Sequence, residues 1–588
     1  MKIRYILSTV FAVCCSLALQ AQKDTALVRE MLLEKEYNPT IMTATRLNFL
    51  PEIKEPQLRK IAPEYSNYAS PFNTKPQIVQ IDSEPFYTDI SESDKRGYLK
   101  AGIATNLNLN GDLGYQILRT QETQFDIYAS HRSANSSMTY LQESSEKQKM
   151  KMNDTWGALS FRHKYNSLSL FAGLKYTHSS FNYYGYPLIP ERALLLPALN
   201  RNVNQVNNIF DVSAGVKSDG TDDWNYYAKF NYISFDQEFS TSKELLGPKE
   251  SIGKLDWDVS YRFSGDNKYG IAGYVYGMFY DYLQPKEGLR YYNGYKDHVR
   301  IVGNPYVDFL DLSWKVHLGA KIYTTFGYGD VFAIAPDLGF FIYPTEDSEL
   351  YLTTTGGLNS NSNYTVYQTN RYAGPQNRIA DTRTDLDAVL GYKMNIDRNF
   401  WFNLYAGYQI DKGAHFFRAE YPNPSSFMSA IAGNVAIADT MNANLFKIGV
   451  HTKYKIQDAF EIGLQAQYNM WDVDNYDYQG PVASKAWYKP VFECDLTAGY
   501  RFTAIPLRLD LLYHLETGRN ALVCIPTEEE YTVKMDNINE INVTATYTIN
   551  KTFSVYGILN NLLSQNYDIM YGYPAQGVNF MLGGSIKF

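Results

Sequence analysis

Charged and amide side chains recur at alternate positions in four segments of the carboxyl-terminal half of the chain. The residues between them are mostly apolar, so in a β-strand the polar side chains would share one face. A row of hydrated charges and amides can bind or pass a polar solute. The residues that we predict to line such a route are Lys447, Lys453, Glu461, Gln465, Gln467, Arg508, Asp510 and Lys587.

Patterns that indicate an enzyme or a metal site are absent from the sequence. The 8 histidines are scattered, and there is no Gly-x-Ser-x-Gly elbow and no phosphate-binding loop. Asp472, Asp474 and Asp477 share one predicted loop, but Tyr476 takes the third position of a calcium-binding pattern, which favours a solvated acidic loop. We therefore expect no enzyme, no cofactor and no metal site.

The elements that would position the polar row are strands with period-two alternation. Each segment is about as long as the ~9–11 residues with which a tilted strand crosses a bilayer. Outward residues would be apolar and inward residues polar or small. The clearest segments are 446–454, 460–469, 507–516, 541–549 and 552–561.

Short and long connections alternate along the chain, as periplasmic turns and external loops do in outer-membrane barrels. Two predicted external connections are short, near Asn110 and near Gly327-Gly329. This predicts an all-β fold, a transmembrane antiparallel β-barrel of about 22 strands over residues 97–588. A soluble β-sandwich also alternates, but it does not explain the alternation of turns and loops. Short turns include Leu310-Asp311 and Asn550-Lys551, and long stretches include 183–204, 360–380, 411–443 and 517–535.

Both ends of the chain agree with export to an outer membrane. Lys2 and Arg4 precede an apolar run, which predicts a signal peptide at 1–21. At the other end, residues 578–588 alternate up to Phe588, a pattern typical of the closing strand of a barrel. The chain has 51 Tyr and 31 Phe, which suits aromatic girdles, and its net charge of -8 argues against nucleic acid as a partner.

Cysteines and aromatic loops leave alternatives open. Cys494 and Cys524 either pair or stay free thiols, because sequence does not set their distance. Aromatic platforms in external loops suit glycans or flat apolar ligands, but the outer girdle needs aromatics at the same height, and we favour the girdle. The aromatic loops are Tyr183-Tyr184-Gly185-Tyr186, Tyr291-Tyr292-Asn293-Gly294-Tyr295 and His415-Phe416-Phe417-Arg418.

The last 33 residues carry an Asn-Leu pair at Asn561-Leu562, then Tyr567, then a Gly-Tyr-Pro-x-x-Gly loop at 572–577, then the closing strand. This hairpin resembles the final hairpin of TonB-dependent outer-membrane receptors, whose barrels have 22 strands. The resemblance implies a receptor barrel that the barrel-assembly machinery inserts through the terminal strand, with Phe588 as the assembly signal.

The plug domain of that family has no full counterpart in this chain. Residues 22–96 contain seven prolines, which favours extended segments over a compact domain. They form a periplasmic or lumenal segment that either serves as a reduced plug or binds TonB, a lipoprotein or another periplasmic protein. A separate protein or external loops such as 411–443 are other ways to fill the lumen. The residues that resemble a TonB box, or else form ordinary linker, are Thr40, Ile41, Met42, Thr43 and Ala44.

These observations predict a protein of the Gram-negative outer membrane, surrounded by lipid. Its expected role is uptake or passage of a solute too large or too scarce for general porins. The alternative is a scaffold that transports nothing and whose segment 22–96 recruits another envelope protein.

Overall fold

A computed structural model describes most of residues 95–588. The predicted signal peptide and segment 22–94, including the TonB-box candidate, lie outside the described residues. The described residues are 95–142, 147–188, 204–220, 222–239, 247–281, 296–374, 379–396, 399–420, 434–456, 459–474, 485–525 and 530–588.

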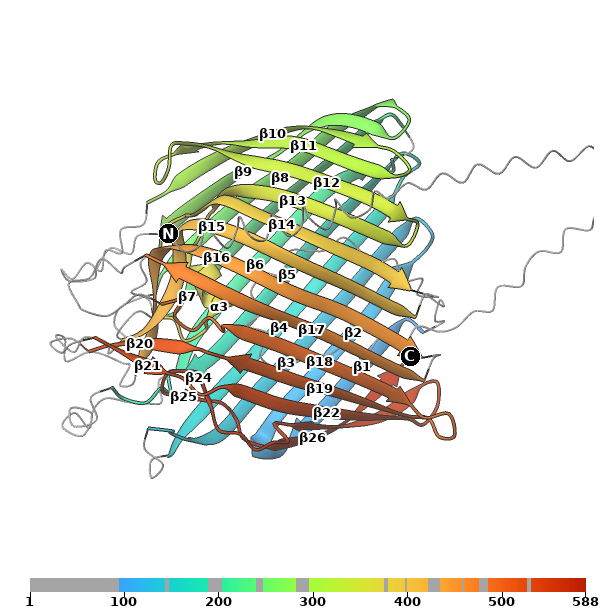
Figure 1. The fold of residues 1–588 in the computed structure, drawn as a ribbon. Helices are drawn as coiled ribbons and strands as arrows, with labels where there is room; N and C mark the ends of the chain where they lie inside the picture. The colour runs from blue at the N-terminus through green and yellow to red at the C-terminus, as the bar shows by residue number, and fades with distance from the viewer. Residues whose placement is uncertain are drawn as a thin grey trace, which may run out of the picture. The chain divides into compact units, whose positions relative to one another are not determined.

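Twenty-two antiparallel strands form one closed barrel, which confirms the predicted fold and strand number (Figure 1). Neighbours in the chain pair in order, and β26 closes the ring on β1 from Tyr98↔Lys587 to Ala104↔Met581. The barrel strands are β1 (Gly97–Ala104), β2 (Asn108–Arg119), β3 (Thr123–Thr139), β4 (Lys147–Lys164), β5 (Leu168–Asn182), β6 (Asn204–Ser218), β7 (Trp224–Gln237), β8 (Lys249–Ser264), β9 (Asn267–Asp281), β10 (His298–Leu310), β11 (Trp314–Phe326), β12 (Phe332–Thr345), β13 (Ser348–Asn359), β14 (Thr382–Ile396), β15 (Phe400–Glu420), β16 (Val435–Ile456), β17 (Phe460–Val473), β18 (Phe492–Arg501), β19 (Leu507–Thr517), β22 (Ile538–Thr548), β23 (Phe553–Asn560) and β26 (Asn579–Lys587).

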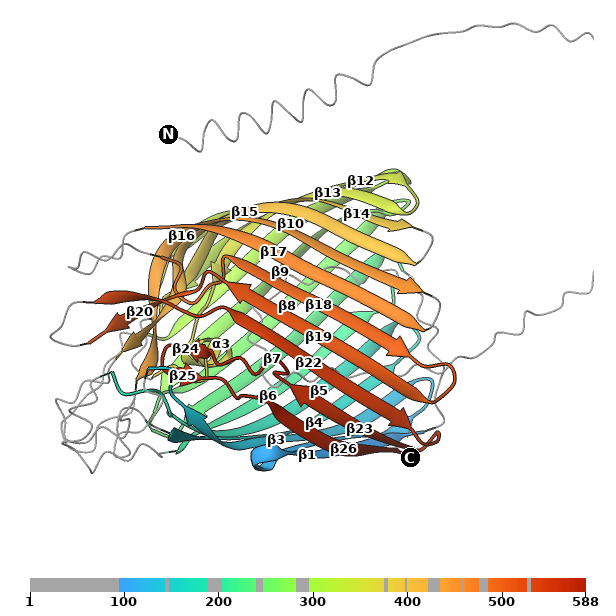
Figure 2. The same cartoon turned by 60° about the horizontal axis from the view of Figure 1, so that its bottom comes forward.

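The connections make the two ends of the barrel different. Short turns and both ends of the barrel chain lie at one end, the turn end, and longer connections lie at the other, the loop end (Figures 1 and 2). The short β1–β2 connection is the 3-10 turn η1 (Thr105–Leu107). Further elements form in the longer connections: α3 (Asn363–Thr369), β20 (Asn520–Cys524), β21 (Tyr531–Lys534), β24 (Asp568–Met570) and β25 (Tyr573–Pro574).

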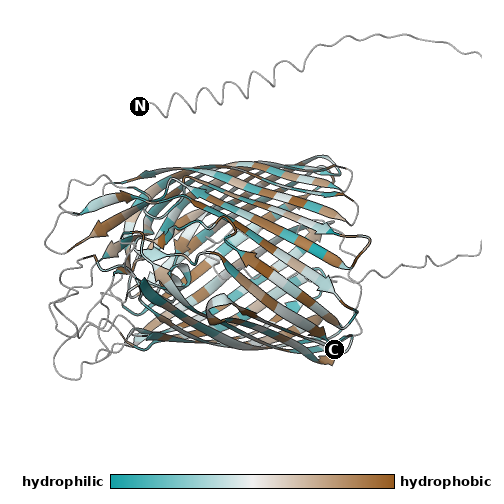
Figure 3. Cartoon of the chain, turned by 90° about the horizontal axis from the view of Figure 1, so that it is seen from below, coloured by the Kyte–Doolittle hydropathy of each residue, from teal (hydrophilic) through white to brown (hydrophobic). Residues whose placement is uncertain are grey.

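The strands alternate in hydropathy, as the stripes of Figure 3 show. On β26 the outward Leu582 is 57% exposed, whereas the inward Met581 is 5% exposed. Such outward apolar residues are stable against lipid and unfavourable against water. In the described part of the chain, no helix is both long and apolar enough to cross a membrane.

The structure corrects three predicted connections. The described parts of 411–443 are strand almost throughout, because β15 and β16 run for 21 and 22 residues, and 517–535 contains strands β20 and β21, which pair with each other. The turn expected near Asn110 lies at Thr105–Leu107 instead. Asn110-Gly111 reads as a hairpin turn, but Asn110 pairs with Gly102 inside the β1–β2 ladder.

Candidate functional site

The barrel encloses a cavity of about 4300 Å³ that runs from the turn end to the packed loops. Period-two alternation turns one face of each strand toward it. All eight predicted route residues lie on its wall: Lys447, Lys453, Glu461, Gln465, Gln467, Arg508, Asp510 and Lys587.

Most charges among these residues are paired. Lys453 Nζ lies 2.8 Å from Glu461 and Arg508 Nε 2.8 Å from Asp510. Lys447 reaches past β15 to Asp387 on β14, at 3.2 Å. The Lys447 side chain passes over Gly407 on β15, which has no side chain to block it. A Cβ at position 407 would lie only 2.7 Å from Lys447 Cε. Sequence reasoning missed Asp387, since the pair skips one strand.

Two tyrosines cross a neighbouring strand at a glycine in the same way. The Tyr405 ring covers Gly449 on β16, and its hydroxyl donates to Gln467 on β17 at 2.6 Å. The Tyr351 ring covers Gly391 on β14, and its hydroxyl donates to Asn403 on β15 at 3.0 Å. These hydrogen bonds fix aromatic faces on the cavity wall.

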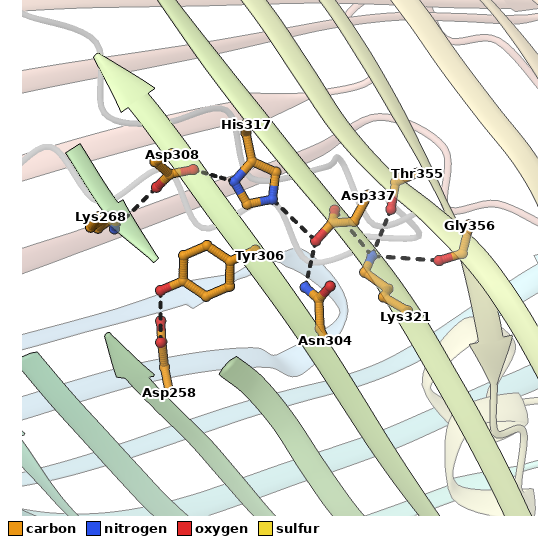
Figure 4. A network of polar contacts seen from close by, with 10 residues as sticks. All are labelled: Asp258, Lys268, Asn304, Tyr306, Asp308, His317, Lys321, Asp337, Thr355 and Gly356. Carbon is orange, nitrogen blue, oxygen red and sulfur yellow. Dashed lines mark hydrogen bonds and ion pairs between the residues drawn. The ribbon is translucent and has the colours of Figure 1, made fainter. Parts of the chain in front are cut away.

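A second polar network joins the inner faces of β8 to β13 (Figure 4). At its centre His317 contacts Asp308 through Nδ1 and Asp337 through Nε2. Lys268 lies 3.3 Å from Asp308, and Lys321 lies 3.6 Å from Asp337. Sequence reasoning missed this pair, because the turn predicted at Leu310-Asp311 would place Asp308 opposite Ser313. The observed turn lies two residues later and places Asp308 opposite His317.

The network is structural: Asp308 and Asp337 each have basic neighbours, and Asp258 accepts a hydrogen bond from the Tyr306 hydroxyl at 2.8 Å. Within the described residues, no group of three His, Cys, Asp or Glu could hold a metal ion. Asp474 accepts a hydrogen bond from Asn442 at 3.1 Å, and Asp477 lies outside the described residues.

At the loop end, buried aromatic residues form a lid, defined by segments 181–186, 363–374, 414–420, 434–441 and 570–574. Tyr573 and Tyr184 are both 0% exposed, and their ring centroids lie 5.0 Å apart. Tyr372 stands 4.4 Å from Tyr573. Phe416 and Phe417 are buried as well. The girdle prediction is therefore wrong for both described aromatic loops, which fold inward onto one another.

The lid spans the barrel mouth. β5 and β16 are eleven places apart in the ring of 22 strands, so they face each other across the lumen. Asn434, just before β16, donates its side-chain N–H to the carbonyls of Tyr186, which follows β5, at 3.1 Å, and of Tyr571, at 2.9 Å. The Tyr573 hydroxyl donates to the Asn434 carbonyl at 2.6 Å.

The segment with α3 is anchored to the wall by charged side chains, of which Glu250 and Arg300 are fully buried. Glu250 on β8 accepts the N–H groups of Asn363 and Tyr364 at 2.8 and 3.0 Å, which caps α3. Beyond α3, Arg371 pairs with Asp154 on β4 at 2.7 Å. At its base, Arg300 on β10 pairs with Asp381 and donates to Ser360 at 2.6 Å.

No protein-family model matches the chain, and no curated protein matches it. Solved structures do match. The pyoverdine outer membrane receptor FpvA from Pseudomonas aeruginosa PAO1, bound to pyoverdine, is 12% identical with a TM-score of 0.59, covering 85% of this chain and 80% of that chain.

Two further structures give the same result. The FrpB iron transporter from Neisseria meningitidis (F3-3 variant) is 10% identical, with a TM-score of 0.62 over 84% of this chain and 82% of that one. The ferric-catecholate import receptor Fiu from E. coli K12 is 10% identical, with a TM-score of 0.57 over 84% and 82%. The barrel has the fold of TonB-dependent outer-membrane receptors. The similar solved structures are receptors and transporters rather than enzymes.

The receptor fold places this barrel in the Gram-negative outer membrane, with the turn end toward the periplasm and the lid outside. Phe588 lies at the periplasmic end of the closing strand, stacked on Tyr115 at 5.9 Å, and its role in assembly stays a prediction.

Cys494 and Cys524 are both free thiols.

The external loop beside the lid contains a carboxyl group whose charge should lower the stability of the protein at neutral pH. Asp568 is buried in the external loop of this receptor fold, and burial raises its pKa from 3.8 to about 6, against the opposing effects of Gln142, Gly572 and Arg519. The folded state then binds its proton more tightly than the unfolded state. Stability should therefore fall as pH rises from about 4 to about 6, by roughly 3 kcal/mol at most.

Asp568→Asn should remove this dependence. Thermal unfolding, followed in near-ultraviolet circular dichroism of the lid tyrosines, should give the variant a higher midpoint than the parent at pH 7.5. The two midpoints should lie closer together at pH 4.5. An equal difference at both pH values would show that the titrating group is not Asp568.

Proposed function

We propose that this chain moves a polar solute across the outer membrane through its own lumen, as a receptor-type uptake or passage protein. The observation that carries the proposal is the cavity of about 4300 Å³ inside a barrel of receptor fold. Its wall of paired charges, amides and tyrosine faces offers hydrogen bonds to a hydrated solute without a net desolvated charge. The residues that we place on the solute's route are those predicted from the sequence.

Transport on this proposal requires the lid to move. Asn434 and Tyr573 join segments from opposite walls, so a large solute enters only when those contacts break. The lid can open without unfolding the transmembrane part of the strands, since the barrel keeps its own ladder of hydrogen bonds.

We also propose two partners, supported by sequence pattern. Residues 22–96 contact TonB through Thr40, Ile41, Met42, Thr43 and Ala44, or another periplasmic protein. The barrel-assembly machinery recognises the terminal strand with Phe588. Lipid surrounds the outward apolar residues.

Single-channel conductance in planar bilayers tests the function with four proteins. They are the parent, a lid variant (Asn434→Ala with Tyr573→Ala), a form lacking 22–94, and the combination of both changes. We expect the parent to be closed and the combination to conduct, and the two single changes identify which end closes the lumen. Electrophoretic heat modifiability shows that each barrel is folded.

Two results would contradict the proposal. If the folded combination stays closed, the lumen is no route, and the scaffold alternative predicts a stable co-purifying partner that is lost on deleting 22–96. If the parent conducts as much as the combination, the lid does not gate passage.

A further inference from the structure

Three lysines stand on the outer wall of the barrel, on the side away from the cavity. They occupy alternate positions at the loop end of β4, so their side chains share one face of the strand. Met150 and Met152, which alternate with them, are 1% and 5% exposed and lie in the buried cluster of the lid. The lysines therefore face outward, and we call Lys147, Lys149 and Lys151 the lysine row.

The position of the row along β4 places it at the outer surface of the membrane. β4 begins its crossing at Lys164 beside a periplasmic turn, and a tilted strand spans the hydrocarbon with ~9–11 residues. Counted from Lys164, this span ends near Asn153. The outward residues agree, because Leu159 and Phe161 are apolar and exposed, whereas those beyond Gly157 are polar. The row thus lies at the height of the lipid headgroups of the outer leaflet.

Among the described residues, no carboxylate balances the charge of the row. Its register partners on β3 are Thr139, Ser137 and Asn135. On the other side, the backbone N–H of Lys151 donates to the Asn182 side chain of β5 at 2.7 Å. None of the described outward residues at the loop ends of β3, β4 and β5 is acidic. Residues 143–146, with Glu143 and Glu146, lie outside the described residues.

Three other outward cations at the loop end have carboxylate partners. Lys249 lies 3.8 Å from Asp236, and Lys412 lies 2.8 Å from Asp385. Arg383 lies 2.6 Å from Asp385 as well. The lysine row differs from these pairs in offering its charge to a group outside the protein.

A cleft of about 200 Å³ lies beside the row on the same outer wall. It forms because β1 and β2 are only 8 and 12 residues long, whereas β3 and β4 have 17 and 18 and extend beyond the turn η1. That turn contributes Leu107, which is 68% exposed, and the strands contribute mainly hydroxyl, amide and ammonium groups. The cleft is lined by Leu107, Ser133, Ala134, Asn135, Lys151, Asn153, Ser180 and Asn204.

We propose that the lysine row and this cleft bind the phosphorylated sugar headgroup of an outer-leaflet glycolipid. The ammonium groups pair with its phosphates, since lysine binds phosphate as a point charge and basic clusters at a membrane surface select anionic lipids. The hydroxyl and amide side chains of the cleft bind its sugar hydroxyls. Leu107 contacts the first part of an acyl chain. This site is on the outer wall, so it does not depend on whether a solute passes through the lumen.

Native mass spectrometry of the purified full chain in detergent tests the choice of ligand. Diphosphoryl lipid A should bind at least about tenfold more tightly than the same lipid without its phosphates, because hydrogen bonds to charged groups are worth about that factor. Excess inorganic phosphate should not displace the lipid. Equal binding of the two lipids, no binding of either, or displacement by inorganic phosphate would overturn the proposal.

The variant Lys147→Gln, Lys149→Gln, Lys151→Gln tests the row itself. It should lose at least about tenfold in affinity for diphosphoryl lipid A, for the same reason. Its side chains point away from the lid and the cavity, and electrophoretic heat modifiability shows that the barrel is folded. Unchanged affinity in the folded variant would contradict the proposal.

The matched control is Lys249→Gln, Arg383→Gln, Lys412→Gln. It removes the same charge from outward positions at the same end of the barrel, and it should bind diphosphoryl lipid A like the parent. An equal loss of affinity in both variants would show attraction by overall charge and no site at β4.

Amine acylation of the unaltered protein gives a test that needs no substitution. In phosphatidylcholine nanodiscs, adding diphosphoryl lipid A should slow the acylation of Lys149 and Lys151, as followed by mass spectrometry of the peptides. Lys412, which is paired with Asp385, should react at the same rate in both kinds of nanodisc. No slowing, or equal slowing at Lys412, would count against the site. None of these readouts uses conductance, so failure here and failure of the transport function are distinguishable.

Discussion

Replacing Tyr573 with alanine should release the lid. Tyr573 is 0% exposed, its ring packs against those of Tyr372 and Tyr184, and its hydroxyl donates to the Asn434 carbonyl at 2.6 Å. Truncating a buried aromatic to alanine costs about 3–5 kcal/mol. Hydrogen exchange measured by mass spectrometry should show protection of segments 363–374 and 434–441 falling by roughly 100-fold or more, at about tenfold for each 1.4 kcal/mol.

The matched control is Tyr328→Ala. Tyr328 lies in the β11–β12 connection at the same end of the barrel but is 36% exposed, so its loss should leave lid exchange unchanged. Far-ultraviolet circular dichroism should report an intact barrel in both variants. Unchanged protection in Tyr573→Ala would mean that the tyrosine cluster is not what holds the lid.

Arg300→Ala should have the second large effect, on overall stability. Arg300 is 0% exposed and contacts Asp381, Ser360 and Thr325. Its removal leaves the largely buried carboxylate of Asp381 without its cation, and breaking a buried pair in this way costs about 3–5 kcal/mol. Urea unfolding in detergent micelles should show the loss as a lower midpoint.

Lys254→Ala is the control for this prediction. Its ion pair with Asp256, at 2.7 Å, is partly exposed, so its loss should cost only about 0–1 kcal/mol. The double variant Arg300→Ala, Asp381→Ala removes both charges and should recover part of the stability. A cost for Arg300→Ala no greater than that for Lys254→Ala would contradict a structural role for this pair.

The barrel could be predicted from the sequence because the alternation within each strand shows which residues face the lipid and which face the lumen. Alternation along 446–454 or 507–516 needs no knowledge of neighbours, and it placed Lys447 and Arg508 on the cavity wall. Pairs across one hairpin need the turn to be placed correctly, and the turn predicted at Leu310-Asp311 was two residues too early to pair Asp308 with His317. Pairs that skip a strand, such as Lys447 with Asp387, could not be predicted from alternation, because they depend on the glycine between them.

The lid could not be predicted from the sequence, for a different reason. Its contacts join residues hundreds of positions apart, such as Tyr184 and Tyr573, and no local pattern encodes them. An aromatic loop residue suits a lipid interface as well as a buried cluster, so composition did not separate the two. The upper parts of β15 and β16 were read as loop because a bulge between Asp411 and Ala414, with Gly413 at a φ of 68°, interrupts the alternation.

The bond between Asn434 and Tyr186 also has a mechanical consequence. A closed ring of strands resists stretching around its circumference, but it flattens into an oval easily, because flattening keeps every ladder bond. A brace between two diametrically opposed strands removes that freedom at the outer rim. The lid is thus a crossbeam as well as a cover, and whatever opens it also lets the rim change shape.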